Sequence, residues 1–219
     1  MGVLRTLGLN ASYTRMIRPA HDQPSQLIST DSLRFPIGAG SDSQFPDAEI
    51  IQHLIDAEEV LEARLYSPLQ TKVIEEFYRL FTGRFNLSIR PIGDAGLGAI
   101  TGAPGDSGGA KPAKPSVELN GETMIDPDRY IVDTTSYVPA VVFTDTMTPD
   151  LSDHLENPIK ITYEYTPIVP NRVKAALTQG VRAFFLARSA GMPFPQRNFD
   201  ISVGQMLDGL LPINVGDVR

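Results

Sequence analysis

The sequence predicts an α+β fold: a small helical bundle with a β-rich insertion between its second and third long helices, and an extended arm at each end. Apolar residues recur at helical spacing in three stretches, at about residues 46–65, 68–82 and 170–190. Between the last two, at about 85–165, short alternating segments separated by turn residues indicate strands. We therefore expect a loop-rich N-terminal arm (1–45), a core (46–192) and a C-terminal tail (193–219).

The first helix is expected to begin after Pro46. Asp47 and Glu49 lie in its first turn, where negative charge is favourable to the helix dipole. The expected buried face is apolar and consists of Ile50, Ile51, Leu54, Ile55, Leu61 and Leu65. The opposite face is acidic and includes Glu58, Glu59 and Glu62, a pattern that is usually a solvated surface.

A second helix is predicted after the break at Tyr66. Ser67 can cap it, Pro68 suits its first position, and Gln70 completes a capping box. Gly83 is a suitable end. Because the turn is short, we expect the first two helices to pack as an antiparallel pair.

The insertion is predicted to contain several strands. Alternating apolar and polar residues indicate them at 85–90, 117–119, 123–125, 130–132, 138–143 and 159–163. Asn120-Gly121 is a strong hairpin signal between two of these strands. Residues 93–116 are rich in Gly, Pro and Ala and are expected to form a mobile loop.

The third helix is predicted to follow Pro170-Asn171 and to end before Gly191. The tail beyond it carries four apolar residues for which we see no place in the bundle: Val203, Leu207, Leu210 and Leu211. Extended tails often become ordered on a partner, so these residues are a candidate docking segment.

Composition narrows the classes of protein. The chain has no cysteine, which excludes disulfides and thiolate metal sites. The formal net charge of -7 argues against tight binding to phosphates. No apolar run is long enough for a membrane span, and residues 1–10 do not resemble a signal peptide.

Motifs with possible chemistry lack the context that the chemistry needs. Residues 105–109 read Gly-Asp-Ser-Gly-Gly, as around the nucleophile Ser of chymotrypsin-like proteases, but no base or oxyanion hole is in evidence for Ser107. The glycines from Gly93 to Gly102 lack a following Lys-Ser or Lys-Thr. The polar cluster that ends at His154 matches no metal-loop spacing. We therefore predict no catalytic residue, no cofactor and no metal.

The order of elements resembles the head–tail connector, or adaptor, proteins of long-tailed bacteriophages and phage-like particles. The similar parts are the acidic-apolar helix from Asp47, the stretch from Val73 to Ile92, and the Pro127–Val132 strand. They continue with an apolar strand, a polar loop, Ile159–Tyr163 and a proline-started helix from Val173 to Arg188. The resemblance covers roughly residues 47–190.

The resemblance implies a structural virion protein that is not an enzyme. Members form a ring, typically of twelve copies, which lies beneath the portal, extends the DNA channel and receives the next neck or tail-completion protein. The implied location is the neck of a virion assembled in a host cytoplasm. Glu58, Glu59 and Glu62 are then candidates to face the channel, where DNA would pass without specific binding. The tail from residue 199 is a candidate for docking on the portal.

Other classes of function stay open at this stage. A tail-completion or other neck protein would contact the tail tube instead of the portal. A hydrolase that uses Ser107 would need the loop around it to be rigid. A small-molecule binding module would need a convergent polar pocket, for which the sequence gives no sign.

Overall fold

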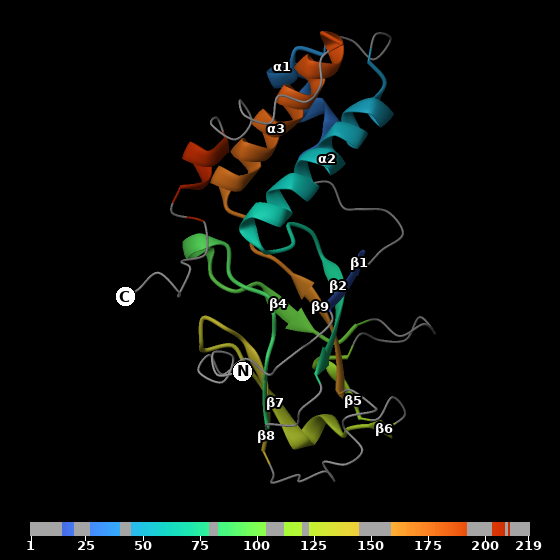
Figure 1. Ribbon diagram of the computed structural model, residues 1–219, viewed down its shortest axis with the longest axis vertical. Helices are drawn as coiled ribbons and strands as arrows, with labels where there is room; N and C mark the ends of the chain where they lie inside the picture. The colour runs from blue at the N-terminus through green and yellow to red at the C-terminus, as the bar shows by residue number, and fades with distance from the viewer. Residues whose placement is uncertain are drawn as a thin grey trace, which may run out of the picture. The chain divides into compact units, whose positions relative to one another are not determined.

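The computed structural model describes residues 15–19, 27–39, 45–78, 83–103, 112–119, 123–144, 159–191, 203–208 and 210. The fold contains helices and sheets, which confirms the predicted α+β class (Figure 1). The chain divides into two compact units. The sheet unit comprises Met1–Pro24, Gln70–Arg90 and Leu97–Thr166, and the helical unit comprises Ser25–Leu69, Pro91–Gly96 and Pro167–Arg219.

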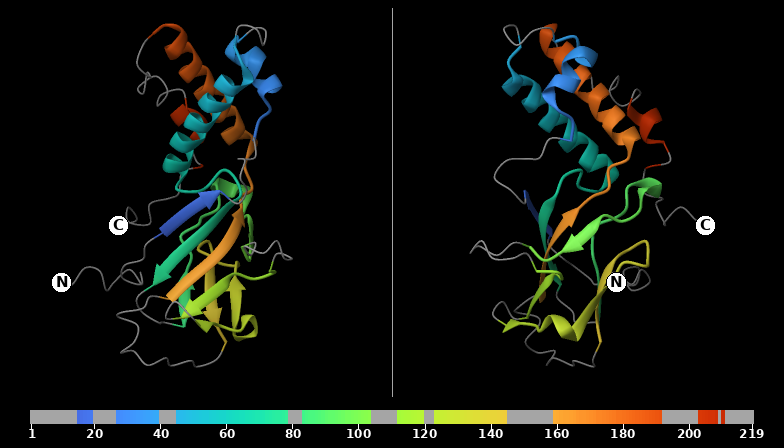
Figure 2. Two further views of the ribbon diagram at one scale, coloured as in Figure 1. Left: turned by 90° about the vertical axis from the view of Figure 1, so that its right-hand side faces the viewer. Right: turned by 180° about the vertical axis from the view of Figure 1, so that it is seen from behind.

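The helical unit is built on two long helices, α2 (Asp47–Leu65) and α3 (Asn171–Ser189), both close to their predicted positions. A short helix, α1 (Thr30–Ile37), packs against α3, and residues 203–207 form a further helical turn (Figures 1 and 2). Leucine, isoleucine and valine side chains from all four segments form one buried cluster. This cluster is the core of the unit.

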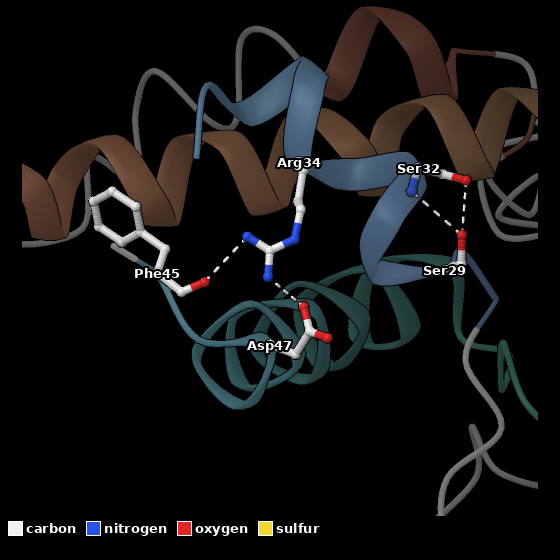
Figure 3. Close-up of polar contacts among 5 residues, drawn as sticks. All are labelled: Ser29, Ser32, Arg34, Phe45 and Asp47. Atoms are coloured by element: carbon white, nitrogen blue, oxygen red, sulfur yellow. Dashed lines mark hydrogen bonds and ion pairs between the residues drawn. The ribbon is translucent and has the colours of Figure 1, made fainter. Parts of the chain in front are cut away.

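Helix α1 lies in the stretch that the sequence predicted to be a loop-rich arm, so that prediction is wrong for residues 30–37. The Ser29 hydroxyl caps the helix by accepting from the Ser32 amide at 3.3 Å. Arg34 donates to the Phe45 carbonyl at 3.1 Å and to the Asp47 carboxylate at the start of α2 (Figure 3). Leu33 and Ile37 are buried, so three side chains hold α1 in place.

The sheet unit contains two antiparallel sheets (Figure 1). The larger has the order β1 (Arg15–Pro19), β2 (Lys72–Tyr78), β9 (Ile159–Thr166), β5 (Ser116–Leu119) and β6 (Thr123–Met124), with β4 (Ala99–Thr101) also paired to β9. The smaller has the order β3 (Arg84–Asn86), β8 (Ala140–Phe143) and β7 (Tyr130–Asp133). Strand β9 is central and is buried along most of its length. The strand predictions within 85–90, 130–132, 138–143 and 159–163 are confirmed.

The predicted second helix at 68–82 is wrong, because residues 72–78 form strand β2. β2 pairs with β1 on one side and with β9 on the other. A central strand that is covered on both faces lacks clean alternation, and Val73 and Ile74 are both buried. Val73, Ile74 and Phe77 are therefore spaced as on one face of a helix. Valine, isoleucine and aromatic residues nevertheless favour strands.

The expected loop at 93–116 is also more ordered than predicted. It contains a 3₁₀ turn (Gly93–Ala95), strand β4 and the start of β5. Ile100 of β4 lies opposite Tyr165 of β9, a pairing of distant segments that local composition cannot reveal. The β5–β6 hairpin is confirmed by the register of Leu119 against Thr123, although Asn120-Gly121 itself lies outside the described residues.

A buried carboxylate connects three parts of the sheet unit. Glu76 on β2 is 1% exposed and accepts a hydrogen bond from the Tyr163 hydroxyl of β9 at 2.6 Å. It also accepts from the Ser88 hydroxyl at 2.7 Å, the Ser88 amide at 2.9 Å, and the Tyr78 hydroxyl. The Tyr78 oxygen lies 2.8 Å from the Asn86 carbonyl oxygen, a second possible acceptor. Buried charge is tolerated when it is bonded in this way.

Candidate functional site

The three carboxylates predicted to face a channel have different environments on α2. Glu58 is buried in the helical unit, with 5% of its surface exposed. Glu62 is half-buried and accepts a hydrogen bond from the Leu69 amide at 2.8 Å, which fastens the turn after the helix. Glu59 is exposed. The structure therefore places only Glu59 of the three on a free surface of the single chain.

His53 lies one helical turn from Glu49 on the same helix and is buried, with 5% of its surface exposed. Its ring stacks on Phe184 of α3 at a centroid distance of 6.2 Å and an angle of 14°. Among the described residues neither ring nitrogen has a hydrogen-bond partner. Burial lowers the pKa of His53 below its usual value, Arg188 lowers it further, and Asp56 and Glu49 oppose the change. The neutral imidazole thus behaves as part of the apolar core.

The tail residues have a place in the bundle, so the contrary expectation is wrong. Val203, Leu207 and Leu210 are buried in the core of the helical unit. Their i, i+4, i+7 spacing was the signal in the sequence that indicated a helical face. A Cβ atom on Gly93 would lie 2.4 Å from Leu210, so the two segments are in close contact. Leu211 lies outside the described residues.

Helix α3 has a basic outer surface. It contains no acidic residue, and Arg172, Lys174 and Arg182 are exposed. Within the described part of the chain these three cations have no ion-pair partner, whereas Arg188 pairs with Glu49 of α2 at 3.2 Å. Two cations at the start of a helix oppose its dipole. Stability of the single chain does not explain their presence there.

The helical unit also has an open hollow and several exposed apolar side chains. The hollow has a volume of about 330 Å³ and is lined by Arg172 and Ala175 of α3 and by Gln205 and Met206. Phe35 of α1 is 95% exposed, and other large apolar side chains at least half exposed are Tyr66, Ile131, Tyr137, Ile168 and Leu186. Exposed apolar groups of this size often mark contact surfaces.

The described residues contain no arrangement suited to catalysis by a metal. No group of three or more His, Asp or Glu side chains could hold an ion within the described ranges. Ser107 and the cluster ending at His154 lie outside those ranges. In the described part of the chain, the helices are too short or too polar to cross a membrane.

Comparison with known proteins gives a fold and no family. No protein-family model and no curated protein matches the chain. A chain in the virion of a native gene transfer agent particle matches with a TM-score of 0.59 and 15% identity, over 91% of this chain and 97% of that one. A chain in the neck of an empty gene transfer agent particle, computed with C6 symmetry, matches with a TM-score of 0.57 over the same shares, again at 15% identity. The protein therefore shares its fold, across both units, with chains of phage-like particles.

Proposed function

We propose that this protein is a structural component of the neck of a phage-like particle, where copies form a ring that joins the portal to the neck or tail. The observation that carries the proposal is the fold match over 91% of this chain and 97% of a chain in a particle neck. A likeness that spans both units is difficult to attribute to a common small motif. The fold match agrees with the resemblance to head–tail adaptors, which was based on the order of elements predicted from the sequence.

The surface chemistry supports a role in assembly. Large apolar side chains stand exposed on both units, among them Phe35 and Leu186 on the helical unit and Ile131 and Tyr137 on the sheet unit. A monomer gains nothing by exposing them, whereas a neighbouring subunit can bury them. In a ring these residues lie at contacts with other copies, with the portal or with the next neck protein.

An acidic channel is part of the proposal. The net charge is -7 per copy, and repetition around an axis would produce a strongly negative ring. DNA would then pass with few attractive contacts to its phosphates. On the structure, Glu59 is the predicted channel residue available for this role, because Glu58 and Glu62 are engaged within their own chain.

A neck protein on the tail side is the second candidate. The same fold match favours it equally, since the neck contains both positions and the match does not say on which side a chain lies. The two candidates differ in partner: the adaptor binds the portal, and the tail-completion protein binds the tail tube. We propose the adaptor because strands β2 to β9 follow helix α2 and precede helix α3, which is the order on which the comparison with adaptors was based.

The deciding experiment measures the mass of the full chain by light scattering, first alone and then with purified portal protein. The adaptor role predicts a defined complex with many copies on each portal ring. A chain that ignores portal and assembles on tail tubes would support the second candidate. A chain that associates with neither would overturn the proposal.

Docking of the tail on the portal needs a revised test. Removal of residues 199–219 would strip Val203, Leu207 and Leu210 from the core and would unfold the helical unit. A truncation after Leu210 retains these residues and removes 211–219, including Leu211. We expect this shorter chain to stay folded and to lose portal binding. Undiminished binding would show that residues 211–219 are not the docking segment.

A further inference from the structure

Phe35 is the first of two features of the helical unit that the single chain leaves unused. Its side chain is 95% exposed, although three nearby residues of α1 are engaged. Leu33 and Ile37 are in the core, and Arg34 holds Phe45 and Asp47 (Figure 3). The helix therefore cannot rotate to bury the ring. An aromatic side chain held rigidly outward suits an interface, because little conformational freedom is lost on binding.

Asp31 gives this aromatic group a negative neighbour. It lies four residues before Phe35, so both side chains are on the same side of α1, about one helical turn apart. Asp31 is exposed, and within the described residues it has no ion-pair partner. Asp31 and Phe35 together form what we call the knob.

The hollow lined by Arg172, Ala175, Gln205 and Met206 is the second unused feature. Its volume of about 330 Å³ exceeds that of a cavity of about 150 Å³ that holds benzene, so it can receive a phenylalanine ring. Met206 offers a thioether, which packs favourably against aromatic rings. Arg172 can pair with a carboxylate or lie over the ring. The hollow therefore matches the knob in size, in apolar character and in charge.

The knob and the hollow belong to different ends of the helical unit. Figures 1 and 2 show α1 beside the C-terminal half of α3, and the helical turn at 203–207 beside its N-terminal half. The hollow includes residues 172 and 175 at the start of α3. A chain cannot fill its own hollow with its own knob, but each copy can fill the hollow of the next.

We propose that Phe35 of one copy inserts into the hollow of the neighbouring copy, with Asp31 paired to Arg172 across the contact. Such a contact joins two different patches, and it forms a ring when the rotation between successive copies closes. The proposal rests on the ring-forming function proposed above and identifies a surface through which that ring closes. It also accounts for a cation at the start of α3 that no residue of the described chain neutralises.

Complementation between two variants tests the direction of the contact. Phe35→Ala removes the knob and retains the hollow, whereas Ala175→Trp fills the hollow and retains the knob. Both positions are exposed, so each variant should fold. With or without portal, we expect neither variant to form rings and an equal mixture to form heterodimers, because one productive contact remains. Arg182→Ala is the control at an exposed residue of α3 that does not line the hollow, and it should assemble like the natural protein.

Cross-linking tests the same contact independently of ring stability. The chain has no cysteine, so an introduced pair reports on its own position. Asp31→Cys with Arg172→Cys should give a ladder of disulfide-linked multimers on mild oxidation of the concentrated protein. The control pair, Asp31→Cys with Asp128→Cys, should give no such ladder, since Asp128 is exposed and belongs to the sheet unit, whereas the hollow is part of the helical unit.

The outcomes separate this inference from the neck function. If Phe35→Ala forms rings on portal as the natural protein does, or if the two cysteine pairs cross-link equally, the contact is wrong and the neck function stands. If the natural protein fails to assemble on portal or tail while the first cysteine pair still gives its ladder, the contact stands and the neck function is wrong.

Discussion

Glu76 is a single side chain on which strand β2, strand β9 and the segment after β3 all depend. Glu76→Ala takes this acceptor away from the donors of Tyr163 and Ser88, whereas the Tyr78 hydroxyl can still donate to the Asn86 carbonyl. Each such donor costs about 1–3 kcal/mol. We expect the free energy of unfolding to fall by about 3 kcal/mol or more, measured by urea denaturation followed by circular dichroism.

Two variants control for the charge and for the strand itself. In Glu76→Gln the amide oxygen can take the place of Oε1 and accept from Tyr163 and Ser88, while the Tyr78 hydroxyl donates to the Asn86 carbonyl, 2.8 Å away. This variant should therefore retain most of the stability that Glu76→Ala loses. Glu75→Ala removes a neighbouring half-buried carboxylate, 3.7 Å from Lys160, and should cost about 1 kcal/mol or less. Equal losses in all three would show that the hydrogen bonds of Glu76 contribute nothing special.

His53 makes the helical unit sensitive to pH. Burial lowers its pKa in the folded chain below the ordinary 6.5, so the unfolded chain takes up the proton first. The stability due to the neutral ring is complete above pH 6.5 and decreases as the pH falls from there to the lowered folded value. The charged groups that act on the pKa of the ring are Arg188, which lowers it, and Asp56 and Glu49, which raise it.

The matching variant is His53→Leu, which cannot titrate. We expect the natural chain to lose stability between pH 7.5 and pH 5.5 by up to about 1.4 kcal/mol for each pH unit below 6.5. The variant should lose less over the same interval in thermal denaturation. Parallel curves for the two chains would assign the pH dependence to carboxylates and not to His53.

At the scale of elements, Gly93 controls how the C-terminal segment packs. Its φ of +58° is in the left-handed region, and an added Cβ would lie 2.4 Å from the Leu210 side chain and 3.3 Å from its Cα. Gly93→Ala should therefore displace Leu210 from the core. We expect stability to fall by about 2 kcal/mol, and amide exchange of residues 203–208 to become faster.

Gly96→Ala separates the two causes of that loss. Gly96 also has a positive φ, +82°, but a Cβ there would meet nothing within 4 Å. It should show the cost of backbone strain, about 1 kcal/mol, without faster exchange at 203–208. Faster exchange in both variants would contradict a role for the contact with Leu210.

The sequence predicted the elements whose pattern is local and missed those that depend on distant partners. Helices α2 and α3 have a single apolar face each and were found within a few residues. Strand β2 pairs with β1 on one side and with β9 on the other, and its buried residues include the neighbours Val73 and Ile74, so its burial depends on partners that no local window of sequence contains. Strand β4, with three residues, is likewise defined by β9.

The sequence predicted which types of residue the candidate site contains, but not which of their side chains are exposed and which are engaged within the chain. Acidic residues on α2 are evident from the sequence, but a helical wheel cannot show that Glu62 turns to the Leu69 amide. The exposure of Phe35 depends on Arg34, whose partners follow 11 and 13 residues later. Arg172 meets Gln205 and Met206 only because the chain returns to α3.

At the scale of the whole molecule, the charge predicts how the protein treats DNA. With a net charge of -7, the natural chain should not retard a DNA duplex in a gel at about 0.15 M salt, even at protein concentrations of about 100 µM. The comparison is Asp56→Lys with Glu59→Lys, which reverses two charges on α2. This variant should bind DNA measurably better, and binding by the natural chain would argue against a non-adhesive channel.

The division into two units has a consequence for synthesis on the ribosome. The chain passes from one unit to the other after residues 24, 69, 90, 96 and 166, so no continuous fragment contains either unit. Strands β2, β4 and β5 all pair with β9, and α1 and α2 both pack on α3. Strand β9 and helix α3 are therefore translated after the elements that pack on them. A chain released early can complete neither unit, and so prematurely terminated copies have no folded surface with which to enter a growing particle.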